Sequence, residues 1–196
     1  MQETQPGPIR IKLITQLEGS YLDEAAKKRL AEQLAPGAVN IITKYVQVRL
    51  PRKYSIRMPK PSPGSKEGMC NDAYAAPLWE DGGIRGHDLV LFVTANATKD
   101  CKQGALAYTL PCLTDMVTGR PTAAGLNICP LSQRSSPPRL LNTLVHELVH
   151  ALVSTRLGVS KTLSLSETNQ SCPILACVPS EGLILRVHCD AAQAAT

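Results

Sequence analysis

Five consecutive residues, His146-Glu147-Leu148-Val149-His150, combine two metal-binding side chain types with one carboxylate. In an α-helix, residues four apart lie on the same face, so His146 and His150 are expected to direct two imidazole nitrogens at one ion. Imidazole is a common ligand of tetrahedral zinc. We expect Glu147 to face the open, water-occupied position, to take a proton from that water and to pass it to a leaving amine. The spacing therefore predicts a zinc site of the HExxH type, the pattern of zinc peptidases.

An apolar run over residues 140–152 carries these side chains and predicts a helix over about 138–157. Ser136 is suited to the N-cap, Pro137 to the first turn and Gly158 to the C-terminal cap. The competing interpretation is a structural helix with two hydrogen-bonded histidines and a surface glutamate. Two of the chain's four histidines fall on one face of this segment. Such an ionisable cluster is costly to bury without a ligand, which favours the metal site.

The hydrophobic pattern of the rest of the chain predicts strands together with one further long helix. Leucines and an alanine at four-residue spacing predict an amphipathic helix over 23–34, which Pro36-Gly37 interrupts and which resumes at 39–45. The nearly continuous apolar run 88–95 predicts a central strand buried on both faces. The other expected strands are 9–14, 46–50 with 54–57 as its hairpin partner, 123–128 and, in the tail, 183–187.

Length and composition predict one domain, or one domain with a tail, because the chain has 196 residues of which 43% are hydrophobic. No apolar run reaches about 18 residues, so we expect no transmembrane helix. The first eight residues lack an apolar region, so we expect no signal peptide in this chain. Seven cysteines without a CxxC pair predict disulfides and an oxidising compartment. The odd count leaves one thiol unpaired or paired outside the chain.

The net charge of +5 arises largely from one basic region. Its members are Arg49, Arg52, Lys53, Arg57, Lys60 and Lys66. Tyr54 is the one aromatic residue among them that could stack on a base. A solvated hairpin explains the region better than a nucleic-acid interface, so we expect no nucleic-acid partner.

The block from Cys101 to Leu152 resembles the leishmanolysin-type metallopeptidases. The residues that carry the resemblance are Cys101, Ala107-Tyr108, Cys112, Asp115, Arg120-Pro121, Ala124-Gly125, Asn127, Cys129-Pro130 and His146-Glu147-x-x-His150-Ala151-Leu152, preceded by a loop with Cys70. The resemblance extends over roughly residues 9–154, although the helix and strands of 9–57 match in order only.

The resemblance implies an α+β, zincin-like fold of the metzincin clan. A twisted mixed sheet would carry two long helices, the second of which presents HExxH. Residues 9–158 would form the catalytic subdomain, and residues 159–196 a diverged or truncated C-terminal segment. The activity implied is that of a secreted or surface-anchored endopeptidase that acts on proteins or peptides with one zinc ion. His146 and His150 would be zinc ligands and Glu147 the catalytic acid and base.

The resemblance also implies two features outside the HELVH segment. Four of the cysteines cluster within 60 residues and match the family block, which implies the disulfides Cys70–Cys112 and Cys101–Cys129. Residues 123–128 precede the loop into the HELVH helix, so they are expected to form the edge strand above the metal. There they would bind substrate by strand addition. The alternative is an edge strand covered by the chain's own tail. The substrate-binding residues expected on this strand are Ala123, Ala124, Gly125 and Leu126.

The chain departs from the family pattern after the second histidine. Val153 stands where the family has glycine, and all four methionines precede the helix, so the methionine turn has no counterpart. A catalytic zinc needs three protein ligands. Among the residues after the helix, His188 is the most zinc-like candidate for the third and Glu167 is a second candidate. The favoured alternative is that His188 is an ordinary surface residue and that the third ligand lies outside this chain. Two functions follow: an active zinc endopeptidase, or an incomplete or inactive peptidase-like domain that acts as a binding or adhesion module.

Overall fold

The computed structural model describes residues 6–48, 51–62, 68–116, 118–153 and 183–185. The helical segments are α1 (Glu24–Arg29), the π-helical η1 (Leu30–Leu34), α2 (Ala35–Tyr45), the 3-10 turns η2 (Ala76–Leu78), η3 (Asp100–Gln103) and η4 (Pro130–Arg134), and α3 (Pro137–Val153). The strands are β1 (Gly7–Pro8), β2 (Ile11–Gln16), β3 (Val46–Val48), β4 (Met69–Cys70), β5 (Ala73–Tyr74), β6 (Leu89–Thr94), β7 (Ala107–Thr114), β8 (Pro121–Ile128) and β9 (Leu183–Leu185). None of the helices in these ranges is long and apolar enough to cross a membrane.

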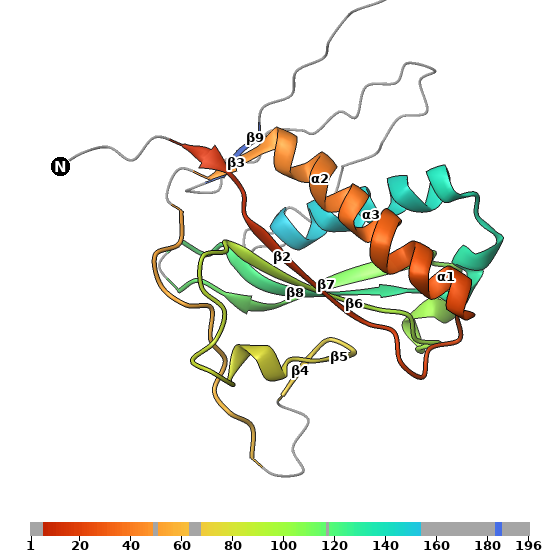
Figure 1. Cartoon of the computed structure of the whole chain (residues 1–196), viewed down its shortest axis with the longest axis horizontal. Helices are drawn as coiled ribbons and strands as arrows, with labels where there is room; N and C mark the ends of the chain where they lie inside the picture. The colour runs from red at the N-terminus through yellow and green to blue at the C-terminus, as the bar shows by residue number, and fades with distance from the viewer. Residues whose placement is uncertain (1–5, 49–50, 63–67, 117, 154–182, 186–196) are drawn as a thin grey trace, which may run out of the picture.

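A four-stranded sheet in the order β2-β6-β8-β7 forms the centre of the molecule. Strands β2, β6 and β8 run parallel to one another, and β7 is antiparallel to β8, so the sheet is mixed. The long helices lie on one face of this sheet, and the short β4–β5 pair lies on the other (Figure 1). The fold is therefore α+β with a mixed sheet and two long helical segments, as the family resemblance implied.

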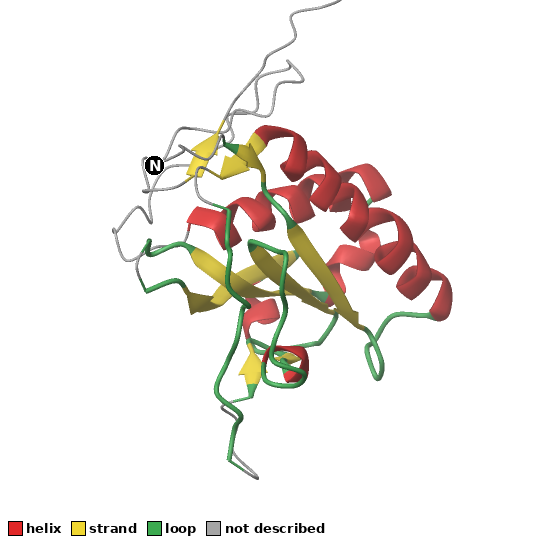
Figure 2. Ribbon diagram, turned by 60° about the vertical axis from the view of Figure 1, so that its left-hand side comes forward, coloured by secondary structure: helices red, strands yellow, loops and turns green. Residues whose placement is uncertain are grey.

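The side chains of the central strand β6 point alternately to the two faces of the sheet, and they contribute to two separate hydrophobic clusters. Leu89, Leu91 and Val93 pack with the helices, whereas Val90 and Phe92 pack with the segments on the opposite face. All six residues of β6 are buried, which confirms the prediction of a central strand covered on both faces. Figure 2 shows the long helices gathered on one side of the sheet. Helix α3 belongs to this layer, where it packs against α2 and against strands β7 and β8.

The first long helical segment is continuous from Glu24 to Tyr45, so the predicted interruption at Pro36-Gly37 is wrong. Asp23 caps its start by accepting a hydrogen bond from the Ala26 N–H at 2.7 Å. The π-helical turn η1 ends at Leu34, two residues before Pro36. Proline supplies no N–H and would collide with the carbonyl group four residues back in a regular α-helix, so a wider turn at this point accommodates it.

The prediction that residues 123–128 form an edge strand is wrong. Strand β8 lies between β6 and β7 and pairs with both of them. Because its backbone hydrogen-bonding groups are used on both sides, β8 has no free edge at which to add a peptide strand. The edge of the sheet on this side is β7.

The predicted hairpin between 46–50 and 54–57 is also absent from the described residues. Instead β3 pairs with β1 and with β9, and Ile56 forms a single bridge to Ile84. The pairing of β9 with β3 bears out a strand in the tail at Leu183–Leu185. Strand partners depend on contacts between distant residues, which local alternation cannot specify.

Two disulfides join the segments around the sheet. Cys70 of β4 bonds to Cys112 of β7, with their Cα atoms 5.2 Å apart. Cys101 of η3 bonds to Cys129 at the end of β8, with their Cα atoms 5.4 Å apart. These are the two pairs that the family resemblance implied. The other three cysteines, Cys172, Cys177 and Cys189, lie outside the described residues.

A buried carboxylate, Asp88, organises the charged side chains at the start of β6. It accepts hydrogen bonds from Arg10 Nε at 2.8 Å and from the Arg52 N–H at 2.7 Å, and Arg120 Nη2 lies 3.6 Å from its Oδ1. Arg52 in turn pairs with Asp115. Burial alone would raise the pKa of Asp88, but the hydrogen bonds from Arg10 and Arg52 outweigh it and lower this pKa. Arg52, one member of the predicted basic region, is thus held by two carboxylates.

Replacing Asp88 with asparagine is expected to lower the free energy of unfolding at pH 7 by about 2 kcal/mol, because the amide carries no charge for the arginines. The folded-state pKa of Asp88 is depressed below the unfolded value of about 3.9, so its stabilisation is present above that value. It is lost as the pH falls through the folded pKa. The difference between wild type and variant in urea unfolding should therefore shrink at acidic pH. Asp81→Asn, at an exposed aspartate, is the control, and an unchanged difference at low pH would contradict the assignment.

Candidate metal and catalytic site

The HELVH segment lies within α3, whose start agrees with the prediction to within one residue. The helix begins at Pro137, and the Leu140 N–H bonds to the Ser136 carbonyl at 3.0 Å. The described helix ends at Val153, and the predicted cap at Gly158 lies outside the described residues. Leu144, Leu148 and the alanine and leucine at 151–152 are buried and face the sheet. Because this stripe faces the interior, His146 and His150 lie on a different, less buried side of the helix.

His146 and His150 point their rings together from successive turns of α3. Their Nε2 atoms are 3.0 Å apart, and their ring centroids are 4.6 Å apart. Two imidazole nitrogens each about 2.05 Å from a tetrahedral zinc ion would be separated by about 3.3 Å. The observed separation is close to this value, so the two nitrogens can share one ion after a small adjustment.

The lowered pKa of His146 also suits metal binding. Burial lowers the pKa of His146 below its ordinary value of 6.5, and the neighbouring His150 lowers it further. His146 is half-buried and His150 is exposed. A neutral imidazole presents the lone pair that a metal requires.

These two histidines fit two of the three protein positions of a catalytic zinc site. Within the described ranges, no group of three histidine, cysteine, aspartate or glutamate side chains could hold a metal ion. His188 and Glu167, the predicted candidates for the third ligand, lie outside those ranges. The two histidines therefore match zinc in the type of ligand and in the spacing of their nitrogens.

Glu147 is partly buried where α3 packs against the edge strand β7. Burial raises the pKa of its carboxyl to about 7, while the hydroxyl and main chain of Thr109 lower it in part. The Thr109 hydroxyl is buried and makes no hydrogen bond with any described residue. A carboxylate in such surroundings can both accept and return a proton near neutral pH.

Strand β7 presents an open edge beside Glu147. The Cys129 N–H bonds to the Leu106 carbonyl at 2.9 Å, and Tyr108 and Leu110 continue this register opposite β8. In an antiparallel pair, alternate residues turn their main-chain groups away from the partner strand. The N–H and C=O groups of Ala107 and Thr109 therefore face the free edge. No other described strand pairs with β7 on this side.

The predicted substrate-binding residues do not reach this edge. Ala123, Ala124 and Leu126 of β8 are at most 1% exposed and pack in the two hydrophobic clusters. Gly125 faces the Cys70 carbonyl. These four positions line the interior, because β8 is a central strand.

Sequence reasoning overlooked Thr109 and the strand that carries it. Residues 107–114 were not predicted as a strand, although Ala107-Tyr108 formed part of the family resemblance. The β-branched and aromatic residues of Ala-Tyr-Thr-Leu, followed by proline, are typical of an edge strand. That signal was available in the sequence, but the proximity of Thr109 to Glu147 was not.

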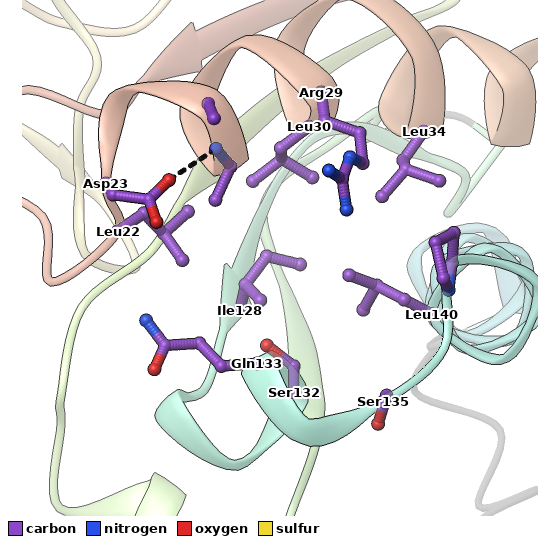
Figure 3. A pocket seen from close by; sticks show the side chains of 13 residues that line it. Leu22, Asp23, Arg29, Leu30, Leu34, Ile128, Ser132, Gln133, Ser135 and Leu140 are labelled. Carbon is purple, nitrogen blue, oxygen red and sulfur yellow. Dashed lines mark hydrogen bonds between the residues drawn. The ribbon is translucent and has the colours of Figure 1, made fainter.

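A separate pocket of about 380 Å³ lies between α1, η4 and the start of α3. Figure 3 shows Arg29, Leu30 and Leu34 on one side of it, Ser132 on the other, and Leu140 of α3 at its border. His146 is six residues beyond Leu140, about 9 Å further along the helix axis. The pocket contributes no side chain to the HELVH site.

Comparison with known proteins places this site in a family. The sequence profile of peptidase family M8, leishmanolysin, matches residues 14–170. Over 74 residues the chain is 36% identical to leishmanolysin-like peptidases of Drosophila pseudoobscura pseudoobscura and Drosophila melanogaster, and 35% identical to that of Caenorhabditis elegans. The aligned stretch covers 36% of this chain and 11% of each relative. The chain belongs to the leishmanolysin family.

Proposed function

We propose that the protein is a zinc-dependent metalloendopeptidase with a zincin-like arrangement of α3 beneath the edge strand β7. The observation that carries the proposal is the 3.0 Å approach of the His146 and His150 Nε2 atoms on the helix that also carries the partly buried Glu147. Family membership supports the same activity. Because the chain matches 11% of the length of its curated relatives, this activity is proposed for the chain and is not transferred from them.

In this proposal, His146 and His150 hold one zinc ion with a third ligand. A zinc ion held there would supply Lewis acidity, which lowers the pKa of water and polarises a carbonyl group. The Glu147 carboxylate accepts the proton of the attacking water and delivers it to the nitrogen of the leaving amine. Its position between α3 and β7 limits competition from bulk water for that proton.

The substrate in this proposal is an extended peptide segment of a protein, bound along β7. Ala107 and Thr109 supply the outward N–H and C=O groups for strand addition. Pro111 has no N–H, and the register shifts between Pro111 and Leu113. Pairing is therefore confined to the part of β7 before Pro111, and the exposed Leu110 lies at its end.

Zinc binding tests the metal part of the proposal directly. The purified chain is expected to bind one zinc ion, measured by isothermal titration and elemental analysis, and His146→Ala and His150→Ala are expected to abolish stoichiometric binding. His87→Ala, at a histidine away from α3, is the control. Loss of zinc affinity in His188→Ala would identify the third ligand. Full binding by His146→Ala and His150→Ala would overturn the metal site.

Peptide cleavage distinguishes the enzyme from the alternative, an incomplete or inactive peptidase-like domain that acts as a binding or adhesion module. An active peptidase would cleave a library of fluorogenic peptides in the presence of zinc and stop on addition of a chelator. A chain that binds zinc and peptides without cleaving them would support the binding module.

We also propose the extent of the catalytic subdomain and the location of the protein. Residues 9–158 act as the catalytic subdomain, since they contain the sheet, both long helical segments and the HELVH residues. The protein works outside the cell or at the cell surface, because the disulfides Cys70–Cys112 and Cys101–Cys129 are stable in an oxidising compartment.

A further inference from the structure

The loop that follows the central strand β6 contains the tripeptide Asn96-Ala97-Thr98. Asparagine, any residue except proline, then serine or threonine is the acceptor pattern for N-linked glycans in secreted proteins. Strand β6 ends at Thr94 and η3 begins at Asp100, so the tripeptide lies in a connection between two elements. The pattern is short, and its surroundings in the fold decide whether an oligosaccharide can be attached there.

The main chain of Asn96 is held in place, whereas its side chain is available. The Asn96 N–H donates to Asn127 Oδ1 at 2.8 Å, and the Asn96 carbonyl accepts from Asn127 Nδ2 at 3.0 Å. The side-chain amide of Asn96 makes no hydrogen bond with any described residue, and it is not among the buried polar groups that lack a partner. Since Asn96 is partly exposed, its amide meets solvent. An oligosaccharide on this nitrogen therefore breaks no hydrogen bond of the described structure.

The rest of the loop keeps Asn96 at the surface. Ala97 is exposed, and the Thr98 hydroxyl lies 2.8 Å from the hydroxyl of Tyr108. Three residues after Thr98, the loop is joined to the end of β8 by the disulfide Cys101–Cys129. This disulfide also indicates the oxidising compartment in which chains are glycosylated.

We propose that Asn96 carries an N-linked oligosaccharide in the folded protein. The Asn96 Nδ2 atom forms a bond to the anomeric carbon of the sugar and loses one proton. The bond from that carbon to the diphosphate of a lipid-linked donor breaks, and the lipid diphosphate leaves. The inference rests on the proposed location outside the cell or at its surface, and it requires neither zinc binding nor peptide cleavage.

The test uses the full chain, expressed behind a secretory leader in cultured animal cells. Chains that have lost the leader are analysed from both lysate and medium, because loss of the leader shows entry into the secretory pathway. Asn169-Gln170-Ser171 is a second acceptor tripeptide, outside the described residues, so every protein also carries Asn169→Gln.

Mass spectrometry of the tryptic peptide 86–99 locates the glycan, because Asn96 is the only asparagine in this peptide. Peptide:N-glycosidase F removes N-linked glycans and leaves aspartate at the position that carried them. We expect aspartate at position 96 after digestion and little unmodified peptide without digestion. Recovery of nearly all of the undigested peptide with unmodified asparagine would overturn the inference.

Three variants assign the glycan to the tripeptide. Ala97→Pro should abolish it, because proline is excluded from the middle position, and no hydrogen bond of the described structure uses the Ala97 N–H. Asn96→Gln should also abolish it, whereas Thr98→Ser keeps the hydroxyl and should retain it. Asn142→Gln, at an exposed asparagine outside any acceptor tripeptide, is the control. A glycan that persists in Ala97→Pro would overturn the assignment.

A further measurement asks whether the native fold accommodates the glycan beside the Cys101–Cys129 disulfide. Unreduced peptides of the glycosylated chain should still contain Cys101 joined to Cys129. Thermal unfolding, followed by circular dichroism, should occur at about the same temperature before and after removal of the glycan. A glycosylated chain without this disulfide, or one that is stabilised by removal of the glycan, would show that the folded loop excludes the oligosaccharide and would overturn the proposal.

Discussion

Replacing Glu147 with glutamine is expected to reduce kcat by about two to four orders of magnitude while leaving zinc affinity unchanged. Glutamine has nearly the same shape as glutamate, but its amide cannot accept the proton of the attacking water. The Glu147 side chain is not part of the histidine pair, so the metal ligands remain in place. Steady-state kinetics on a fluorogenic peptide, with zinc content measured on the same sample, checks both parts.

A matched substitution elsewhere excludes a general effect of removing a carboxylate. Glu32→Gln changes an exposed glutamate on the other long helical segment and should leave the rate as in the wild type. Peptidase activity in Glu147→Gln close to that of the wild type would remove Glu147 from the mechanism. Loss of zinc together with activity would instead indicate that Glu147 helps to hold the metal.

Replacing Gly125 with valine is expected to lower the free energy of unfolding by about 4 kcal/mol, among the largest effects of a single substitution. A Cβ atom at this position would lie 2.4 Å from the Cys70 carbonyl oxygen and 2.6 Å from the Asn71 Cβ. The disulfide between Cys70 and Cys112 ties β4 to the same sheet, so β4 cannot move away freely. Urea unfolding followed by circular dichroism measures the loss.

Gly7 provides the control for this substitution. It lies in the short strand β1, and a Cβ atom there would meet nothing within 4 Å. Gly7→Val should change the free energy of unfolding by less than about 0.5 kcal/mol. Equal stability of Gly125→Val and the wild type would mean that β4 does not press on β8 in solution.

The features that the sequence determined are those encoded by neighbouring residues. A four-residue spacing in an apolar run was enough to put His146 and His150 on one face of a helix, because helical geometry is local. The continuous apolar run of β6 indicated burial on both faces for the same reason. The family resemblance added the pairing of the cysteines, which spacing alone leaves open among several connectivities.

Tertiary structure decided which strand lies at the edge and what surrounds the general base. Residues 123–128 and 107–114 both have patterns compatible with an edge, and only pairing with β6 made β8 central. The raised pKa of Glu147 and its contact with Thr109 arise from packing of α3 against β7, across 38 positions of sequence. The hydrogen bonds of Asp88 likewise join residues 78 and 36 positions apart. Local periodicity determines the face on which a side chain lies, whereas its partners depend on strand order and layer packing, which are set by contacts between segments distant in the chain.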